Sequence, residues 1–358
     1  MKKKIFYISE LNLPNTSAYS IHVMKMCDAF NTLNCEISLI CLNNNLKKNT
    51  FEFYNVKKKF NITSIFKSPK KMNFFSRVFF SLLILKKINY KNSIFLSRSI
   101  IFALIASVMN KNVILELHHE ITGFSKYIYK FLNKMFLLKN LKYIFLHKNL
   151  QKIYKIKNKR KLILDDASDF KNFYFDKKKI KNTCVYVGSF FKGKGLEQID
   201  RLARNNTKIN FHAYGEKKYL TKKKFSKNLK IYDHIQYSKI PLVLSKYHVA
   251  LMPYQDKVKG KSSISLENYM SPLKMFDYLS AGLITVASNL KIYKHILIND
   301  YNCKLLKVND DKLWNKTIND IFANLKKYSY LKKNSIKTAK KYTWDIRAKK
   351  IKLKFFNF

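Results

Sequence analysis

Residues 186–195 read YVGSFFKGKG and hold three of the seven glycines in a chain of 358 residues. At the average glycine content of about 7%, a chain of this length would carry roughly 25. The glycines and lysines of the stretch are Gly188, Lys192, Gly193, Lys194 and Gly195. A glycine-rich turn lets backbone N–H groups approach an anion, and a helix beginning just after it adds its positive end. The stretch therefore predicts an anion-binding loop between a strand and a helix.

The sequence of this loop matches neither of the two common phosphate-binding motifs. It fits neither GxxxxGK(S/T), which would indicate an ATPase, nor GxGxxG, which would indicate a nicotinamide cofactor. A tight strand-to-helix turn with solvated lysines would have the same sequence. The loop sequence alone does not distinguish an anion-binding loop from a plain turn, so the segments on either side of it are needed.

Short apolar runs alternate with helix-like segments on both sides of this loop. The runs are residues 4–9, 36–42, 93–97, 113–117 and 142–146, and then 184–189, 209–214, 229–232, 249–254 and 283–288. Strands buried on both faces have this form, and their alternation with helices predicts parallel sheets. A chain of this length also exceeds one usual core, so we expect two Rossmann-like, doubly wound α/β domains joined near residues 169–181. Ligands of such domains bind beyond the carboxyl ends of the strands, which predicts an active site in a cleft between the two domains.

The net charge of +49 comes from 71 Lys and Arg against 22 Asp and Glu. Such an excess would suit nucleic acid, an anionic membrane or a phosphorylated substrate. The lysines are spread along the whole chain, however, and no recognition helix, RNP aromatic pair or zinc finger is present, so we expect a solvated basic surface and no nucleic-acid partner. A peripheral contact with an anionic membrane stays open.

The cysteines and the hydropathy of the sequence indicate the cellular compartment of the protein. Five cysteines without a CxxC pair favour neither disulfides nor a metal site, which fits a reducing cytoplasm. The most apolar window, residues 74–88, is too short and too charged for a membrane span and predicts a buried helix. Its flanking lysines leave a role at the membrane surface open.

Residues 268–282, NYMSPLKMFDYLSAG, predict a second anion-binding element. Ser271 is the expected N-cap of a helix that starts near Pro272, so the N–H groups of Leu273 and Lys274 would be free for a phosphate. Asp277 lies one turn further on, where its carboxylate could accept two hydrogen bonds from a ribose. An ordinary amphipathic helix with a solvated Asp277 is the alternative.

Two stretches in the first half of the chain carry titratable or small side chains after a strand. Residues 113–124, VILELHHEITGF, place Glu116, His118, His119 and Glu120 at a strand end, and neighbouring histidines diverge, so at most one is expected to face a substrate. Residues 12–30 place the small residues Ser17, Ala18 and Ser20 before a helix that carries His22. A substrate could lie close to this turn, although a plain helix cap would have the same sequence.

These elements, in this order, resemble the retaining glycosyltransferases of the GT-B fold, the group 1 or family four class. The likeness runs over almost the whole chain. The matching segments are PNTSAYSIHVMKMCDAF (14–30), ELHH (116–119), DDASD (165–169), YVGSFFKGKGLEQI (186–199), YHVALMPY (247–254), MSPLKMFDYLSAGLITVAS (270–288) and YTWDIRAKKI (342–351). The resemblance implies an N-terminal acceptor-binding domain (1–168), a C-terminal nucleotide-sugar-binding domain (169–340) and a final helix (341–358) that crosses back to the first domain.

The resemblance also implies roles for the residues in these segments. Lys194 would contact the diphosphate of a nucleotide-sugar donor, Asp277 the ribose hydroxyls and His118 the donor sugar, with no cofactor and no essential metal. The remaining donor-side positions are Gly188, Ser189, Lys192, Gly193, Gly195, Ser271, Pro272, Leu273 and Lys274, and the acceptor-side positions are Ser17, Ala18 and His22. The sugar would pass with retention to a hydroxyl of a glycan or lipid-linked acceptor, as in the synthesis of capsule or lipopolysaccharide.

Three positions depart from the family pattern. Ser189 stands where an Arg is usual, so the second cation of the loop is either missing or supplied by Lys192. Tyr269 replaces a Glu, and Asp277 is one methylene shorter than the common Glu. These departures leave two alternatives open, a weakened GT-B scaffold and a basic interaction protein. An inverting transferase or an epimerase would instead need Glu116 or His22 as a base.

Overall fold

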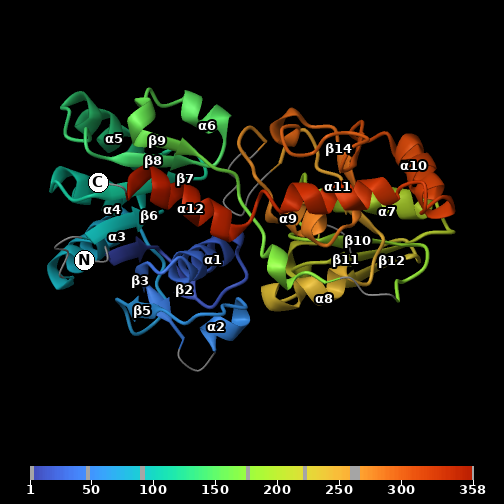
Figure 1. Cartoon of the computed structure of the whole chain (residues 1–358), viewed down its shortest axis with the longest axis horizontal. Helices are drawn as coiled ribbons and strands as arrows, with labels where there is room; N and C mark the ends of the chain where they lie inside the picture. Colours follow the sequence, from blue (N-terminus) through green and yellow to red (C-terminus); the bar gives the residue numbers. More distant parts are fainter. Residues whose placement is uncertain are drawn as a thin grey trace. The chain divides into compact units, whose positions relative to one another are not determined.

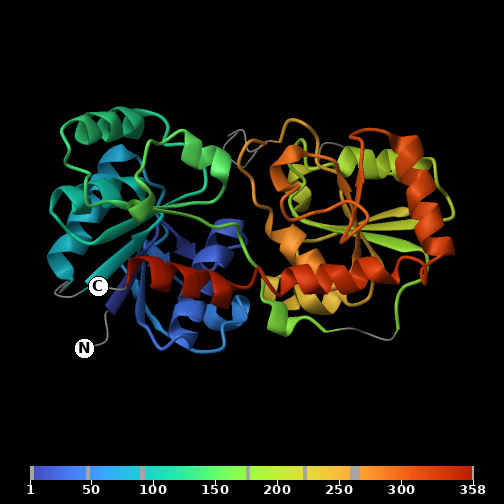
Figure 2. The ribbon, with the colours of Figure 1, turned by 45° about the horizontal axis from the view of Figure 1, so that its top comes forward.

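The structure is a computed structural model that describes residues 4–45, 49–88, 93–174, 178–220, 224–258 and 267–356. Residues 175–177 of the predicted linker lie outside the described residues. The chain divides into two compact units, of which unit 1 comprises Met1–Asp165 and Trp344–Phe358, and unit 2 comprises Asp166–Thr343. Each unit is an α/β domain with helices on both sides of a parallel sheet (Figures 1 and 2).

Unit 1 is built on a seven-stranded parallel sheet in the order β5-β3-β1-β6-β7-β8-β9. The strands are β1 (Lys4–Ile8), β3 (Glu36–Cys41), β5 (Asn61–Ser64), β6 (Ser93–Ser97), β7 (Val113–Leu117), β8 (Lys142–Phe145) and β9 (Lys161–Ile163). The short strands β2 (Asn12–Leu13) and β4 (Asn43–Asn44) pair separately. The strand order reverses between β1 and β6, which is the switch point of the usual Rossmann arrangement.

The helices of unit 1 begin at recognisable caps. They are α1 (Ala18–Thr32), α2 (Thr50–Phe53), α3 (Phe74–Lys87), α4 (Ile100–Val108), α5 (Phe124–Lys134), α6 (Lys148–Lys152) and the C-terminal α12 (Trp344–Phe355). Ser17 caps α1, and Asn73 forms a capping box with Ser76 at the start of α3. Although α12 ends the chain, it packs against α1, and Phe30 stacks on Phe356 there with ring centroids 5.7 Å apart.

Unit 2 has a six-stranded parallel sheet in the order β12-β11-β10-β13-β14-β15. Its strands are β10 (Thr183–Val187), β11 (Asn210–Tyr214), β12 (Leu229–Tyr232), β13 (Val249–Met252), β14 (Ile284–Ser288) and β15 (Lys304–Leu306). Its helices are α7 (Leu196–Arg204), α8 (Ile240–Leu244), α9 (Leu273–Ser280), α10 (Asp311–Ala323) and α11 (Ser329–Ala339). The order again reverses at one point, between β10 and β13.

The predicted fold class is confirmed, and all ten predicted runs contain strands. The edge strand β5 and the short strands β9 and β15 were not predicted. Most of their residues stay partly or fully exposed, so their sequences lack the continuous apolar run that marks a central strand. Within the described ranges, none of the helices combines the length and hydropathy needed to cross a bilayer.

Candidate functional site

The glycine loop of residues 188–195 lies at the switch point of unit 2. It connects β10 to α7, and the segment that follows the neighbouring strand β13 packs against it. The backbone N–H of Gln255 donates to the carbonyl of Gly193 at 2.9 Å. In open α/β sheets, ligands bind at this point because two loops diverge there beyond the carboxyl ends of the strands.

Gly195 is needed where the loop enters α7. Its φ is +95°, and a Cβ placed there would lie 2.1 Å from the carbonyl oxygen of Pro253. We expect Gly195→Ala to destabilise unit 2 by about 1–3 kcal/mol from backbone strain, with the clash adding to it. Urea unfolding measures this loss. Gly123→Ala is a control for backbone strain alone, because Gly123 also has positive φ while its Cβ would meet nothing within 4 Å. An unchanged stability in Gly195→Ala would contradict the close approach at Pro253.

The Lys274 side chain reaches back from α9 to the start of this loop. A Cβ at Gly188 would lie 2.4 Å from Lys274 Nζ, so the glycine makes room for the ammonium group. Nζ lies 3.5 Å from the ring centroid of Tyr186 and is buried without a hydrogen-bond partner among the described residues. Burial, together with the nearby Lys194, holds the pKa of Lys274 well below its usual range.

Lys194 approaches the same place from the other end of the loop. Its Nζ lies 4.7 Å from the ring centroid of Tyr254, and Lys274 Nζ lies 5.2 Å from the same centroid. Burial lowers the pKa of Lys194 to about 8. Within the described part of unit 2, no carboxylate pairs with either lysine. Two amino groups shielded from water, with no carboxylate partner among the described residues, favour the binding of an anion that stabilises their charged forms.

Helix α9 is fixed to β10 by a tyrosine. The Tyr278 hydroxyl accepts a hydrogen bond from the backbone N–H of Val187 at 2.8 Å, which anchors the helix beside Gly188. Leu273 and Lys274 begin α9, so their backbone N–H groups lie at the end of the helix from which the Lys274 side chain extends.

The predicted N-cap of this helix is wrong. The N-cap position is Pro272, which offers no side-chain cap, and Ser271 lies outside the helix. The Ser271 hydroxyl instead accepts from the backbone N–H of Asp166 at 3.0 Å. Asp277 is buried at 4% exposure, and the Tyr237 hydroxyl lies 3.5 Å from its Oδ1. The alternative of a solvated Asp277 is therefore excluded.

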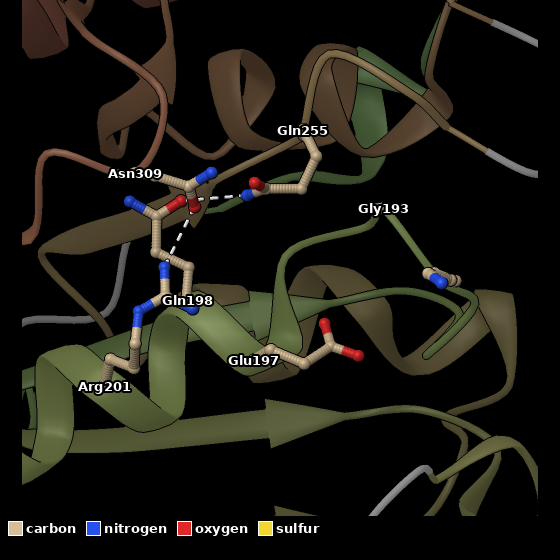
Figure 3. A pocket seen from close by; sticks show the side chains of 7 residues that line it. Gly193, Glu197, Gln198, Arg201, Gln255 and Asn309 are labelled. Carbon is tan, nitrogen blue, oxygen red and sulfur yellow. Dashed lines mark hydrogen bonds between the residues drawn. The ribbon is translucent and has the colours of Figure 1, made fainter.

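Lys192 and Ser189 occupy different surroundings. Lys192 is exposed and lines a cavity of about 480 Å³ on unit 2 together with Glu197, Gln198, Arg201, Gln255 and Asn309. Polar pairs line this cavity: Gln255 donates to Gln198 at 3.0 Å, and Arg201 donates to Asn309 at 2.9 Å (Figure 3). The Ser189 carbonyl accepts from the Tyr186 hydroxyl at 2.7 Å. The side chain that lies over Gly188 is thus that of Lys274.

A second cluster forms in unit 1 around Glu116, at the carboxyl end of β7. Its Oε1 lies 2.8 Å from His22 Nε2, 2.9 Å from His118 Nε2 and 2.8 Å from Arg347 Nη2. The Tyr7 hydroxyl donates to Oε2 at 3.0 Å. Burial alone would raise the pKa of Glu116, but Arg347 and His22 outweigh it and hold the pKa well below the usual range.

His118 is neutral at physiological pH in this cluster. Burial, reinforced by Arg98, lowers the pKa of His118 to about 3. When its Nε2 donates to Glu116, its Nδ1 can accept a hydrogen bond. His119 diverges as expected, with Nδ1 2.7 Å from the Glu120 carbonyl.

The predicted acceptor-side residues lie at the start of α1. Helix α1 begins at Ala18, so Ala18 and Ser20 belong to the helix and do not precede it. The Ser17 hydroxyl accepts from the Ser20 N–H at 3.1 Å, which makes it a helix cap. His22 is buried at 1% exposure, and its ring packs edge-on against the ring of His118 at 4.8 Å. The structure therefore brings His22 and His118 together through Glu116.

Two side chains of these clusters were not predicted from the sequence. The sequence predicted a role for Lys274 only through its backbone N–H and no role for Arg347. Arg347 follows the segment YTW near the chain end and lies 231 positions from Glu116, so no local spacing connects them. One feature of the sequence could have indicated a role for the Lys274 ammonium. The glycine loop has Ser189 where an arginine is usual, and the segment MSPLKMFD carries a lysine that could replace this charge.

Comparisons with known proteins agree with this architecture. Residues 168–338, just under half of the chain, match the family model described as glycosyl transferases group 1. No curated protein sequence matches the chain.

Similar solved structures span the whole chain. A glycosyltransferase from Rickettsia africae is 12% identical, with a TM-score of 0.74 and 100% of both chains covered. HepE from Anabaena, solved with UDP and glucose, is 10% identical with a TM-score of 0.72 and coverage of 99% and 100%. WaaG, a glycosyltransferase involved in lipopolysaccharide biosynthesis, is 10% identical with a TM-score of 0.64 and coverage of 99% and 100%. At such low identity these structures establish the GT-B fold, and together with the family match they support a glycosyltransferase enzyme.

Proposed function

We propose that this chain transfers a sugar from a nucleoside-diphosphate sugar to a hydroxyl of a glycan or lipid-linked acceptor, with retention of configuration. The observation that carries the proposal is the pair of lysines beside the glycine loop of unit 2, the half-buried Lys194 and Lys274 with its buried Nζ, which have no carboxylate partner among the described residues. HepE, which shares the fold, was solved with UDP and glucose. The role of WaaG in lipopolysaccharide biosynthesis supports a place in surface polysaccharide assembly, by analogy of fold. The five free cysteines fit a place in the reducing cytoplasm.

The two lysines would act on the leaving group. In the reaction, the bond between the sugar carbon and the β-phosphate oxygen breaks, and the diphosphate keeps the electron pair. The acceptor oxygen forms the new bond, and its proton passes to an oxygen of the departing diphosphate. Because negative charge grows on the diphosphate in the transition state, fixed cations and N–H groups aimed at it lower the barrier. Lys194, Lys274 and the N–H groups of Leu273 and Lys274 would supply this stabilisation, and transfer would then need no divalent ion.

Lys274 would take the place of the missing loop arginine. Ser189 offers no charge, but the Lys274 ammonium lies over the adjacent Gly188. Asp277, buried one turn further along α9, would bind the ribose. The predicted contacts of His118 with the donor sugar, and of Ser17, Ala18 and His22 with the acceptor, stay predictions. Glu116 does not suit the base of an inverting reaction, because its pairing with Arg347 and its lowered pKa make the carboxylate a poor proton acceptor.

The affinity of the protein for UDP is expected to fall as the pH rises through about 8. In the empty protein Lys194 loses its proton near pH 8, whereas a bound diphosphate favours the charged ammonium, so binding above this pH must take up a proton. The dissociation constant would rise by up to about tenfold per pH unit for this one group. Isothermal titration calorimetry between pH 7 and 10, in buffers of different ionisation enthalpy, measures both the affinity and the proton uptake.

Two controls separate this effect from general charge. Lys194→Met should bind UDP weakly and with a flatter pH profile, whereas Lys316→Met, on the exposed face of α10, should behave like the unmodified protein. ADP and GDP test the nucleotide. If none of these diphosphates binds, or if UDP affinity is constant from pH 7 to 10, the proposed donor site is wrong.

A further inference from the structure

Helices α3 and α5 of unit 1 present exposed aromatic side chains to solvent. These are Phe75 and Phe79 on α3, Phe124, Tyr127 and Phe131 on α5, and Phe136 just after it. Phe75 is 79% exposed and Tyr127 is 70% exposed. The sequence predicted a buried helix for residues 74–88, but only Phe80, Ser81, Ile84 and Leu85 of α3 are buried. The outward stripe of α3 therefore contradicts that prediction. We call the surface formed by the six aromatic residues the α3–α5 face.

The two helices form one continuous surface with α4. The rings of Phe74 and Phe124 meet edge to face with centroids 4.9 Å apart, which joins the start of α3 to the start of α5. A cavity of about 330 Å³ opens among the three helices, and all of its lining residues are apolar; they include Phe74, Ile101, Leu104, Val108, Ile128 and Leu132. Figures 1 and 2 show α3, α4 and α5 next to one another in unit 1. Soluble monomers seldom expose so many large apolar side chains together.

The charges around this face have one sign. Lys126, Lys130 and Lys134 follow one another at four-residue spacing on α5 and are exposed beside the aromatic stripe. Lys86 and Lys87 are exposed at the end of α3. Between residues 53 and 164 the chain has 24 Lys and Arg but only two carboxylates, Glu116 and Glu120. Glu116 is buried, so it adds no negative charge to the surface.

We propose that the α3–α5 face docks on the surface of an anionic lipid bilayer. An interfacial helix carries aromatic and aliphatic side chains on one side and lysines on the other, which is the arrangement of α5. The aromatic rings would enter the headgroup region, the lysines would contact the anionic headgroups, and the apolar cavity would receive hydrocarbon. This inference is independent of the proposed donor site, because it uses other residues of the chain and predicts binding to lipid without any nucleotide.

Co-sedimentation of the full-length protein with vesicles tests the proposal. We expect binding to vesicles of phosphatidylcholine mixed with phosphatidylglycerol, weaker binding to phosphatidylcholine alone, and weakening by added salt. The triple variant Phe75→Ser, Tyr127→Ser, Phe131→Ser should lose at least about tenfold in vesicle partitioning, because three exposed apolar side chains no longer insert. The double variant Lys130→Gln, Lys134→Gln should lose roughly tenfold on anionic vesicles.

Matched controls change the same side-chain types elsewhere. Lys333→Gln with Lys337→Gln repeats the four-residue spacing on α11, and Leu242→Ser with Ile298→Ser removes exposed apolar groups from unit 2. Both controls should partition like the unmodified protein. Equal losses in the controls, or no binding to anionic vesicles, would overturn the proposal. So would a triple variant that keeps vesicle binding but loses self-association in sedimentation velocity, since a second copy would then be the partner.

Discussion

Replacing Lys194 with alanine is expected to lower the rate of sugar transfer about 100- to 1000-fold, or about 3–4 kcal/mol of transition-state stabilisation. Lys194 is a cation in a partly dehydrated position beside the glycine loop, where each charge acts more strongly than in water. An assay of transfer, or of donor hydrolysis, with a panel of UDP-sugars measures kcat and KM. A drop in kcat indicates that the ammonium acts mainly on the developing charge, whereas a rise in KM alone would indicate ground-state binding.

The same variant should not unfold the protein. The Lys194 ammonium is partly shielded from water without a carboxylate partner among the described residues, so its removal relieves a desolvation cost in the empty protein. We therefore expect the Tm of Lys194→Ala to equal or exceed that of the unmodified protein. Lys194→Arg, which keeps the charge, should recover part of the rate, and Lys316→Ala should keep all of it. An undiminished rate in Lys194→Ala would remove this residue from the site.

Sequence patterns predicted the central strands because burial on both faces leaves a local signature. The run VILEL is apolar except for Glu116, and CVYVGS leads directly into the glycine loop. The edge strand β5, with the sequence NITS, lacks such a signature because it lies at the edge of the sheet beside β3 and most of its residues are exposed. Local sequence therefore predicted the sheet centres and the loops that leave them.

Side-chain partnerships between distant segments could not be predicted in the same way. The ammonium of Lys274 lies over Gly188 because Tyr278 anchors α9 to Val187, and this depends on packing between segments about 90 residues apart. Ser271 looked like an N-cap because a serine precedes a proline at a helix start, but the backbone of Asp166 binds its hydroxyl. Tertiary contacts thus overrode a local capping preference.

Glu116→Ala is expected to destabilise unit 1 by about 3–5 kcal/mol. The carboxylate is fully buried, and removing it leaves the Arg347 guanidinium, itself 3% exposed, without its carboxylate partner. Urea unfolding followed by circular dichroism measures the loss. Glu36→Ala is the matched control, since Glu36 pairs with Lys4 at the surface of the same unit and such pairs contribute only about 0–1 kcal/mol.

The pH dependence of this loss gives a second test with a defined sign. The folded-state pKa of Glu116 lies well below its unfolded value of about 4.3, so its stabilisation is complete above that value and is lost as the pH falls toward the folded pKa. The difference in unfolding free energy between the unmodified protein and Glu116→Ala should therefore be largest above about pH 5 and should narrow on acidification. A double variant that also replaces Arg347 with leucine should recover part of the loss, because no buried charge then remains unpaired. If Glu116→Ala were no more harmful than Glu36→Ala, or if the difference widened in acid, the carboxylate would not be the centre that holds His22, His118 and Arg347 together.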